Sequence, residues 1–227
     1  KEIRDQYGIL PAQRAYYAIH EPNSMEEAEL AKRRLIFEEF FIFSAGLSLM
    51  RAARAEKKAP VYESCDLSAF YSSLPFTLTG AQQRAIQEIA ADLQKGAPMN
   101  RLVQGDVGSG KTMVAAAAAY LAIQNGHQAA LMAPTEILAE QHYQSLGKLF
   151  SLLGLRTVLL TGSMSVKEKK QIRALIASGE ADLAVGTHAL LSGATNFHNL
   201  GLVITDEQHR FGVGQRSALS SKGTDPH

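Results

Sequence analysis

Apolar residues recur along this chain with two different periods, and each period predicts a different kind of structure. After residue 24, apolar side chains return at alternating spacings of four and three residues, which is the repeat of one helix face. These side chains are Ile36, Phe40, Phe43, Leu47 and Met50. Ser24 and Glu27 form a capping-box pair, with which many helices begin. We therefore predict one long helix that starts at Ser24, ends near Pro60 and packs its apolar face on a neighbouring domain.

From Leu78 onward the pattern changes to short apolar runs that alternate with helical segments. The apolar runs, predicted as strands, are residues 102–104, 128–133, 157–160, 183–185 and 202–204. The segments predicted as helices are residues 79–94, 110–125, 135–149 and 166–178. Strands that are apolar throughout and alternate with helices indicate an α/β fold, a parallel sheet with helices on both faces. Ligands of such sheets bind beyond the carboxyl ends of the strands.

A stretch with two prolines separates the long helix from the alternating segments. Residues 58–75, which include Pro60 and Pro75, are predicted to be a linker. We accordingly divide the chain into a helical linker segment, residues 1–70, and an α/β domain, residues 71–227. Because the sequence begins with Lys1 rather than methionine and ends without a closing element, we expect it to be part of a longer protein.

Composition narrows the classes of function. Hydrophobic residues make up 46% of the chain, enough for a substantial core. The formal net charge is only +1, so any contact with nucleic acid must depend on local patches and backbone amides. Cys65 is the only cysteine, which excludes an intrachain disulfide and suits a reducing cytosol. No apolar stretch approaches the length of a membrane span, so we expect no membrane contact.

One segment matches the P-loop pattern at every fixed position. Its residues are Gly105, Asp106, Val107, Gly108, Ser109, Gly110, Lys111 and Thr112. In this pattern the backbone N–H groups face phosphates, Lys111 neutralises the β- and γ-phosphate oxygens, and Thr112 offers its hydroxyl to Mg²⁺. The alternative is a plain glycine-rich turn before a helix. The predicted strand before the loop and the predicted helix after it favour nucleotide binding, and we expect the cofactors to be ATP and Mg²⁺.

Two acids follow the last predicted strand. We predict that Asp206 holds Mg²⁺, directly or through water. Glu207 is the predicted catalytic base, which orients and deprotonates the attacking water, and Lys111 is the second catalytic residue. The alternative is a pair of acids that merely ends a strand at the surface. The P-loop upstream in the same alternating series disfavours that alternative.

Four segments together resemble a known family. They are residues 105–112, 133–142 (APTEILAEQH), 186–190 (GTHAL) and 206–213 (DEQHRFGV). In this wording and order, from about Leu74 to Gly223, the chain closely resembles the RecG family of branch-migration helicases, within superfamily 2. The resemblance implies a RecA-like helicase domain 1, preceded by a long linker helix. It also implies ATP-driven remodelling of branched DNA, by fork reversal and Holliday junction migration, in recombination and repair.

The resemblance also assigns residues to adenine recognition and to coupling. Leu78–Gln82 is similar to a Q motif, which implies that Gln82 binds the adenine edge and that Phe76 packs on the base. The alternative for Gln82 is structural, because Thr79 and Gln82 also form a capping-box pair. Within motif II, Gln208 and His209 are implied to couple ATP to DNA, whereas His209 alternatively packs behind the acids.

Six residues after three predicted strands are implied to bind DNA: Pro134, Thr135, Thr161, Gly162, Thr187 and His188. Hydroxyls and backbone amides in such positions bind phosphates without reading bases. Each threonine alone is also typical of an ordinary N-cap or turn, but their shared position on one sheet edge favours DNA. One predicted helix is basic, and we interpret it as a solvated face. Its basic residues are Lys167, Lys169, Lys170 and Arg173.

For the intact protein we expect an ATP-dependent DNA helicase of the bacterial cytoplasm, associated with the nucleoid. Its expected partners are branched, single-stranded or double-stranded DNA, together with a second motor domain and a wedge domain of the same longer chain. In the family the second motor domain donates an arginine to the transferring phosphate, so this part alone is expected to bind ATP and to hydrolyse it poorly.

Two alternatives stay open. One is the motor domain of a transcription-repair coupling translocase, which the sequence before Lys1 would decide. The other is a nucleotide-gated DNA-binding module without hydrolysis. Glu207 disfavours the second, because a module that only binds needs no catalytic base.

Overall fold

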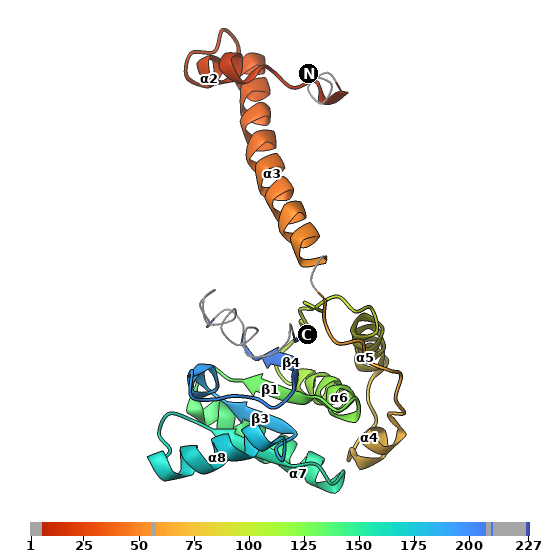
Figure 1. Cartoon of the computed structure of the whole chain (residues 1–227). Coiled ribbons are helices and arrows are strands. Elements are labelled where there is room, and N and C mark those ends of the chain that lie inside the picture. Colours follow the sequence, from red (N-terminus) through yellow and green to blue (C-terminus); the bar gives the residue numbers. More distant parts are fainter. Residues whose placement is uncertain (1–5, 56–57, 208–209, 211–225) are drawn as a thin grey trace. The chain divides into compact units, whose positions relative to one another are not determined.

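The chain divides into two compact units, residues 1–56 and 57–227. The computed structural model describes residues 6–55, 58–207, 210 and 226–227. The first unit consists of helices α2 (Ala12–His20) and α3 (Met25–Ala55) (Figure 1). The predicted long helix is therefore confirmed.

The start of α3 is fixed by polar contacts around Glu27. Ser24 Oγ accepts a hydrogen bond from the Glu27 N–H at 3.1 Å, as the predicted cap requires. The Glu27 carboxylate accepts in turn from the N–H of Asn23 rather than that of Ser24, and it pairs with Arg14 of α2 at 3.1 Å. Further along α3, Phe40 is 68% exposed. Docking of this apolar face on another domain stays a prediction.

The second unit is built on four parallel strands in the order β2-β3-β1-β4. The strands are β1 (Gln128–Met132), β2 (Thr157–Leu160), β3 (Leu183–Gly186) and β4 (Leu200–Thr205). Leu131 in β1 is paired with Val185 on one side and with Ile204 on the other. The predicted parallel α/β fold is thereby confirmed, and the carboxyl ends of all four strands share one edge of the sheet.

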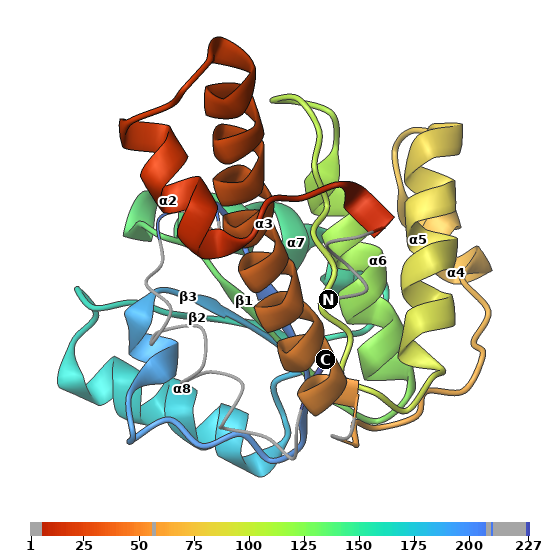
Figure 2. The same ribbon diagram turned by 90° about the horizontal axis from the view of Figure 1, so that it is seen from above.

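Helices cover both faces of this sheet (Figure 2). The helices are α5 (Gly80–Leu93), α6 (Lys111–Gln124), α7 (Glu136–Leu152), α8 (Val166–Ser178) and the short 3₁₀ helix η1 (His188–Leu191). Ala129 and Leu131 of β1 belong to one buried cluster with residues of α5, α6 and α7, whereas Ala130 and Met132 belong to another with residues of α8 and η1. This division follows from the alternation of side chains along a strand. None of the helices described is long and apolar enough to cross a membrane.

The segment before α5 is packed, in contrast to the linker expected at residues 58–75. It contains the short helix α4 (Ser68–Ser73). Phe70 of this helix and Tyr62 are both buried in the core of the second unit. The Tyr62 N–H also donates to the carbonyl oxygen of Leu93 at 3.1 Å, at the end of α5. The domain boundary at residue 70 stays a prediction.

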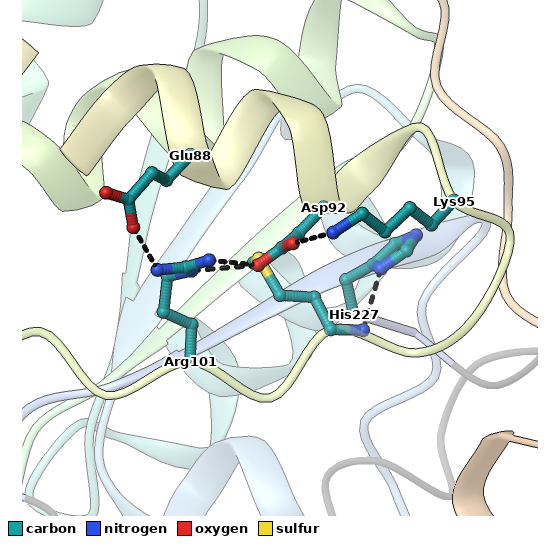
Figure 3. A network of polar contacts seen from close by, with 6 residues as sticks. Glu88, Asp92, Lys95, Arg101 and His227 are labelled. Carbon is teal, nitrogen blue, oxygen red and sulfur yellow. Dashed lines mark hydrogen bonds and ion pairs between the residues drawn. The ribbon is translucent and has the colours of Figure 1, made fainter. Parts of the chain in front are cut away.

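The strand predicted at residues 102–104 is not formed. This segment has no regular secondary structure, and Leu102 is 71% exposed. The preceding residue is held on α5 by ion pairs. The Arg101 guanidinium lies 2.6 Å from a carboxylate oxygen of Asp92 and 2.6 Å from one of Glu88 (Figure 3).

The outer edge of β4 pairs with His227 instead. The Val203 N–H donates to His227 O at 2.7 Å, and the His227 N–H donates to Gly201 O at 2.8 Å. The imidazole of His227 accepts a further hydrogen bond from the Met99 N–H, close to the Arg101 network (Figure 3). A strand forms only where a neighbour satisfies its backbone groups. Residues 102–104 have no strand partner among the described residues, and the P-loop is preceded by an irregular segment rather than by a strand.

Candidate nucleotide and nucleic-acid sites

The P-loop is exposed and leads into α6. Gly108 and Gly110 have left-handed φ angles of 79° and 76°, which side chains disfavour. Among the described residues, no side chain caps the start of α6, and uncapped N–H groups at a helix start are the donors that an anion site uses. The Lys111 ammonium donates to the carbonyl oxygens of Gly105 and Asp106, both at 2.7 Å. Loop amides and an ammonium side by side fit a polyphosphate.

Gln82 is bound at both ends of its amide. Its Oε1 accepts from the Thr79 N–H at 2.8 Å, and Thr79 Oγ1 accepts from the Gln82 N–H at 3.3 Å. These contacts make the capping box that was the alternative interpretation. Gln82 Nε2 donates to Ser109 O at 2.9 Å, which ties α5 to the P-loop. Phe76 is 52% exposed nearby in sequence, and its contact with adenine stays a prediction.

The acids after β4 belong to the same site as the P-loop. Asp206 is anchored by its N–H, which donates to Met132 O at 2.9 Å. Its Oδ2 lies 2.8 Å from His142 Nε2. That hydrogen bond is the main reason why the pKa of Asp206 lies below its usual value. Partial burial opposes the shift, while the charges of His142 and Lys111 favour it. The field of Lys111 thus reaches an ionised carboxylate at the end of β4.

Glu207 has an unusual backbone conformation. Its φ of 45° is the only positive value among the described residues other than glycine. Such conformations are costly and cluster at functional sites. Its N–H donates to Asp206 Oδ1 at 3.0 Å, and its carboxylate pairs with Arg210 at 2.8 Å. Gln208 and His209, predicted to couple ATP to DNA, lie outside the described residues.

His142 is a site residue to which the sequence analysis gave no role. It lies within the motif at residues 133–142, two helical turns after Thr135 on α7. The spacing was a usable signal, since residues seven apart share one helix face. What the pattern could not show is that this face meets the end of β4.

A pocket of about 510 Å³ lies at the carboxyl ends of the other strands. Its lining residues are Pro134, Thr135, Glu136, Gly162, Lys169, Arg173, Thr187, His188 and Ala189. Five of the six residues predicted to bind DNA are therefore brought together. The sixth, Thr161, is 4% exposed and is not among the residues that line the pocket.

Two basic side chains of α8 join this pocket. Lys169 and Arg173 are half-buried there, whereas Lys167 and Lys170 are exposed. Lys169 Nζ donates to the carbonyl oxygen of Gly162, and Arg173 Nε donates to Thr195 Oγ1 at 3.2 Å. Lys169 and Arg173 thus differ from Lys167 and Lys170 in lining the pocket, and whether this helix is a solvated basic face or a DNA site stays a prediction.

The threonines of the pocket differ in their own contacts. Thr135 Oγ1 accepts from the Leu138 N–H at 3.3 Å and so caps α7. Thr187 is 7% exposed, and its side chain does not cap η1. The N-cap alternative therefore holds for Thr135. The role of Thr187 in nucleic-acid binding stays a prediction.

The second unit is a P-loop domain of the RecA-like class. It has a parallel α/β sheet, a P-loop, an acid pair after β4 and a cationic pocket at the same edge of the sheet. Residues 79–223 of the chain match the DEAD/DEAH box helicase family. The chain belongs to the DEAD/DEAH box helicase family and contains its ATP-binding domain.

Within this family, the chain is similar to RecG helicases. The chain is 50% identical to the ATP-dependent DNA helicase RecG of Synechocystis sp. over 100% of its own length and 28% of that protein. It is 47% identical to RecG of Bacillus subtilis, of which it covers 34%. A solved structure of RecG bound to a three-way DNA junction matches 93% of this chain and 29% of that chain, with a TM-score of 0.84 and 42% identity. The resemblance to RecG is confirmed, and the chain spans roughly a third of these relatives.

Proposed function

We propose that this chain is the ATP-binding motor domain of a RecG-like helicase that remodels branched DNA. The observation that carries the proposal is that two sites share one edge of the sheet. Asp206 and Glu207, beside the P-loop, follow β4, and the cationic pocket lies at the carboxyl ends of the other strands. Helix α7 joins them, because its N-cap Thr135 lines the pocket and its His142 bonds to Asp206. A nucleotide site beside a phosphate-binding pocket is what an ATP-driven motor on nucleic acid requires.

In the proposed nucleotide site, the α6 amides and Lys111 bind the phosphates, and Gln82 and Phe76 lie toward the base. Thr112 and Asp206 would hold Mg²⁺, which neutralises charge on the phosphate oxygens when bound. No group of three metal-binding side chains is found in the part of the chain that the structure describes. Mg²⁺ takes most of its ligands from water and phosphate, so two protein ligands would be enough to hold it. Glu207 orients the attacking water once its carboxylate leaves Arg210.

In the proposed DNA site, the pocket binds the phosphate backbone. Lys169 and Arg173 supply positive charge, and the loop at Gly162 supplies backbone amides. Such contacts position a nucleic acid and carry no base information. We therefore propose that binding is independent of sequence, as a motor that moves along DNA requires.

For the intact protein we propose branched DNA as substrate and the bacterial cytoplasm, near the nucleoid, as location. The relatives named above are roughly three to three and a half times as long as this chain, which covers 28% and 34% of them, and this leaves room for a second motor domain and a wedge domain. The similarity to RecG over the whole of this chain favours a RecG-like helicase over a transcription-repair translocase. Glu207 disfavours a module that only binds nucleotide.

A pair of adjacent lysines tests the DNA site. Lys169 lines the pocket, whereas Lys170 is exposed and does not. We expect Lys169→Ala to weaken binding of a single-stranded oligonucleotide by about five- to tenfold, because a charge-assisted phosphate contact is lost. Lys170→Ala should change it by less than about twofold. Fluorescence anisotropy measures both, and a loss confined to Lys170→Ala would place the DNA site outside the pocket.

A further inference from the structure

One carboxylate lies inside the pocket proposed for DNA phosphates. Glu136, the first residue of α7, lines it together with Lys169 and Arg173. Every other lining residue is basic, neutral or a histidine. A fixed negative charge opposes a polyanion at close range, so Glu136 must have another role in this place.

The contacts of Glu136 resemble those of a bound phosphate. Its Oε1 accepts a hydrogen bond from the backbone N–H of Ser163 at 2.9 Å. Hydrogen bonds from Ser163, a further one from the Gly162 backbone, and the charge of Lys169 hold the pKa of Glu136 below its usual value. The carboxylate is therefore ionised, and it uses the loop amides that a phosphate oxygen would use.

We propose that Glu136 is an internal competitor for nucleic-acid phosphate. It occupies the amide of Ser163, beside Gly162, when the pocket holds no nucleic acid, and a phosphate must displace it to bind. This inference rests on the proposed function, because it takes the pocket to be the DNA site. Its effect is to lower the affinity for DNA, so that each phosphate is bound weakly enough to be released.

The local structure permits the exchange. The start of α7 does not depend on Glu136, because Thr135 Oγ1 caps the helix through the Leu138 N–H. The N–H of Ser163 would pass from one anionic acceptor to another and would not be left without a partner. Lys169, held beside the loop by the Gly162 carbonyl, stays close to either anion.

The test compares two glutamates that make similar hydrogen bonds. Glu136→Gln removes the charge inside the pocket. Glu168→Gln removes a charge from the neighbouring helix α8, where Glu168 accepts from the Ser165 N–H at 2.8 Å and does not line the pocket. We expect Glu136→Gln to bind a fluorescein-labelled oligothymidylate about five- to twentyfold more tightly than the unmodified chain at one fixed salt concentration. Glu168→Gln should differ by less than about twofold.

Three results would overturn the proposal in distinguishable ways. Unchanged or weaker binding by Glu136→Gln would make Glu136 a structural tie between α7 and the loop, while the DNA site stands. An equal gain in both variants would indicate a long-range charge effect. Absence of binding by the unmodified chain and by Glu136→Gln alike would reject the DNA site together with the competitor.

A second measurement does not depend on the variant folding. In the unmodified chain, the amide NMR resonance of Ser163 should shift when oligothymidylate is added, because its acceptor changes from carboxylate to phosphate. The resonance of Ser165 serves as the reference, since Glu168 is expected to keep that contact. A Ser163 resonance that stays in place while the oligonucleotide binds would also overturn the proposal.

Discussion

At the scale of single residues, Lys111 shows how the P-loop is arranged for an anion. Its ammonium is oriented by two carbonyl oxygens of its own loop, each at 2.7 Å. Its charge contributes to the low pKa of Asp206 across the site. A cation beside the loop amides attracts phosphate, and the acid at the end of β4 lies within reach of its field.

Replacement of Lys111 tests this arrangement. We expect Lys111→Ala to reduce the free energy of ATP binding by about 2–4 kcal/mol, because a charge-assisted contact with the phosphates is lost. Lys148→Ala, at an exposed position of α7, is the matched control and should bind ATP as the unmodified chain does. Titration calorimetry with ATP and Mg²⁺ measures both. Equal affinity in the two variants would rule out the P-loop as the nucleotide site.

Residue patterns predicted part of the site and left part of it out. The P-loop, the acids and most pocket residues follow from local motifs and from the rule that ligands bind at carboxyl strand ends. Lys169, Arg173 and His142 were missed as site residues. Their roles depend on how a helix is rotated against the sheet, and this rotation is set by packing between distant segments.

At the scale of elements, four of the five apolar runs predicted as strands are strands, and they are parallel as predicted. The runs were informative because buried parallel strands are apolar throughout. The run at residues 102–104 failed for a physical reason. A strand needs a partner, and residues 102–104 have none among the described residues, while the neighbouring Arg101 is held on α5. The short helix α4 was missed because its residues lie between two prolines and resemble a linker.

Close packing of two strands yields a prediction for β3. A side chain at Gly186 would collide with the carbonyl oxygen of Leu160 in β2. We expect Gly186→Ala to lower the free energy of unfolding by about 1–3 kcal/mol, because the strands must separate. Gly193 has open space around it, so Gly193→Ala should change stability by less than about 0.5 kcal/mol. Urea unfolding followed by circular dichroism compares them, and similar stability losses would show that the strands are not tightly apposed.

At the scale of the whole molecule, charge sets how binding depends on salt. The net charge is +1, and the pocket offers Lys169 and Arg173 against Glu136. Few phosphates can therefore be neutralised, and we expect a log–log slope of affinity against salt of about −1 to −3. Oligonucleotides of different sequence should give the same slope and affinity. Anisotropy across a salt series measures this, and a slope steeper than about −5 would indicate a second, wider basic surface.

Helix α7 has a mechanical consequence. From Thr135 in the pocket to His142 beside Asp206, the helix rises by about 10 Å, and residues 136–142 include neither glycine nor proline. A helix without such residues has no ready point at which to bend. In the proposed motor, α7 is therefore a rigid connection between the DNA pocket and the nucleotide site. If the DNA backbone displaces the Thr135 end of α7, the His142 end beside Asp206 moves by a similar distance, because the helix between them does not bend.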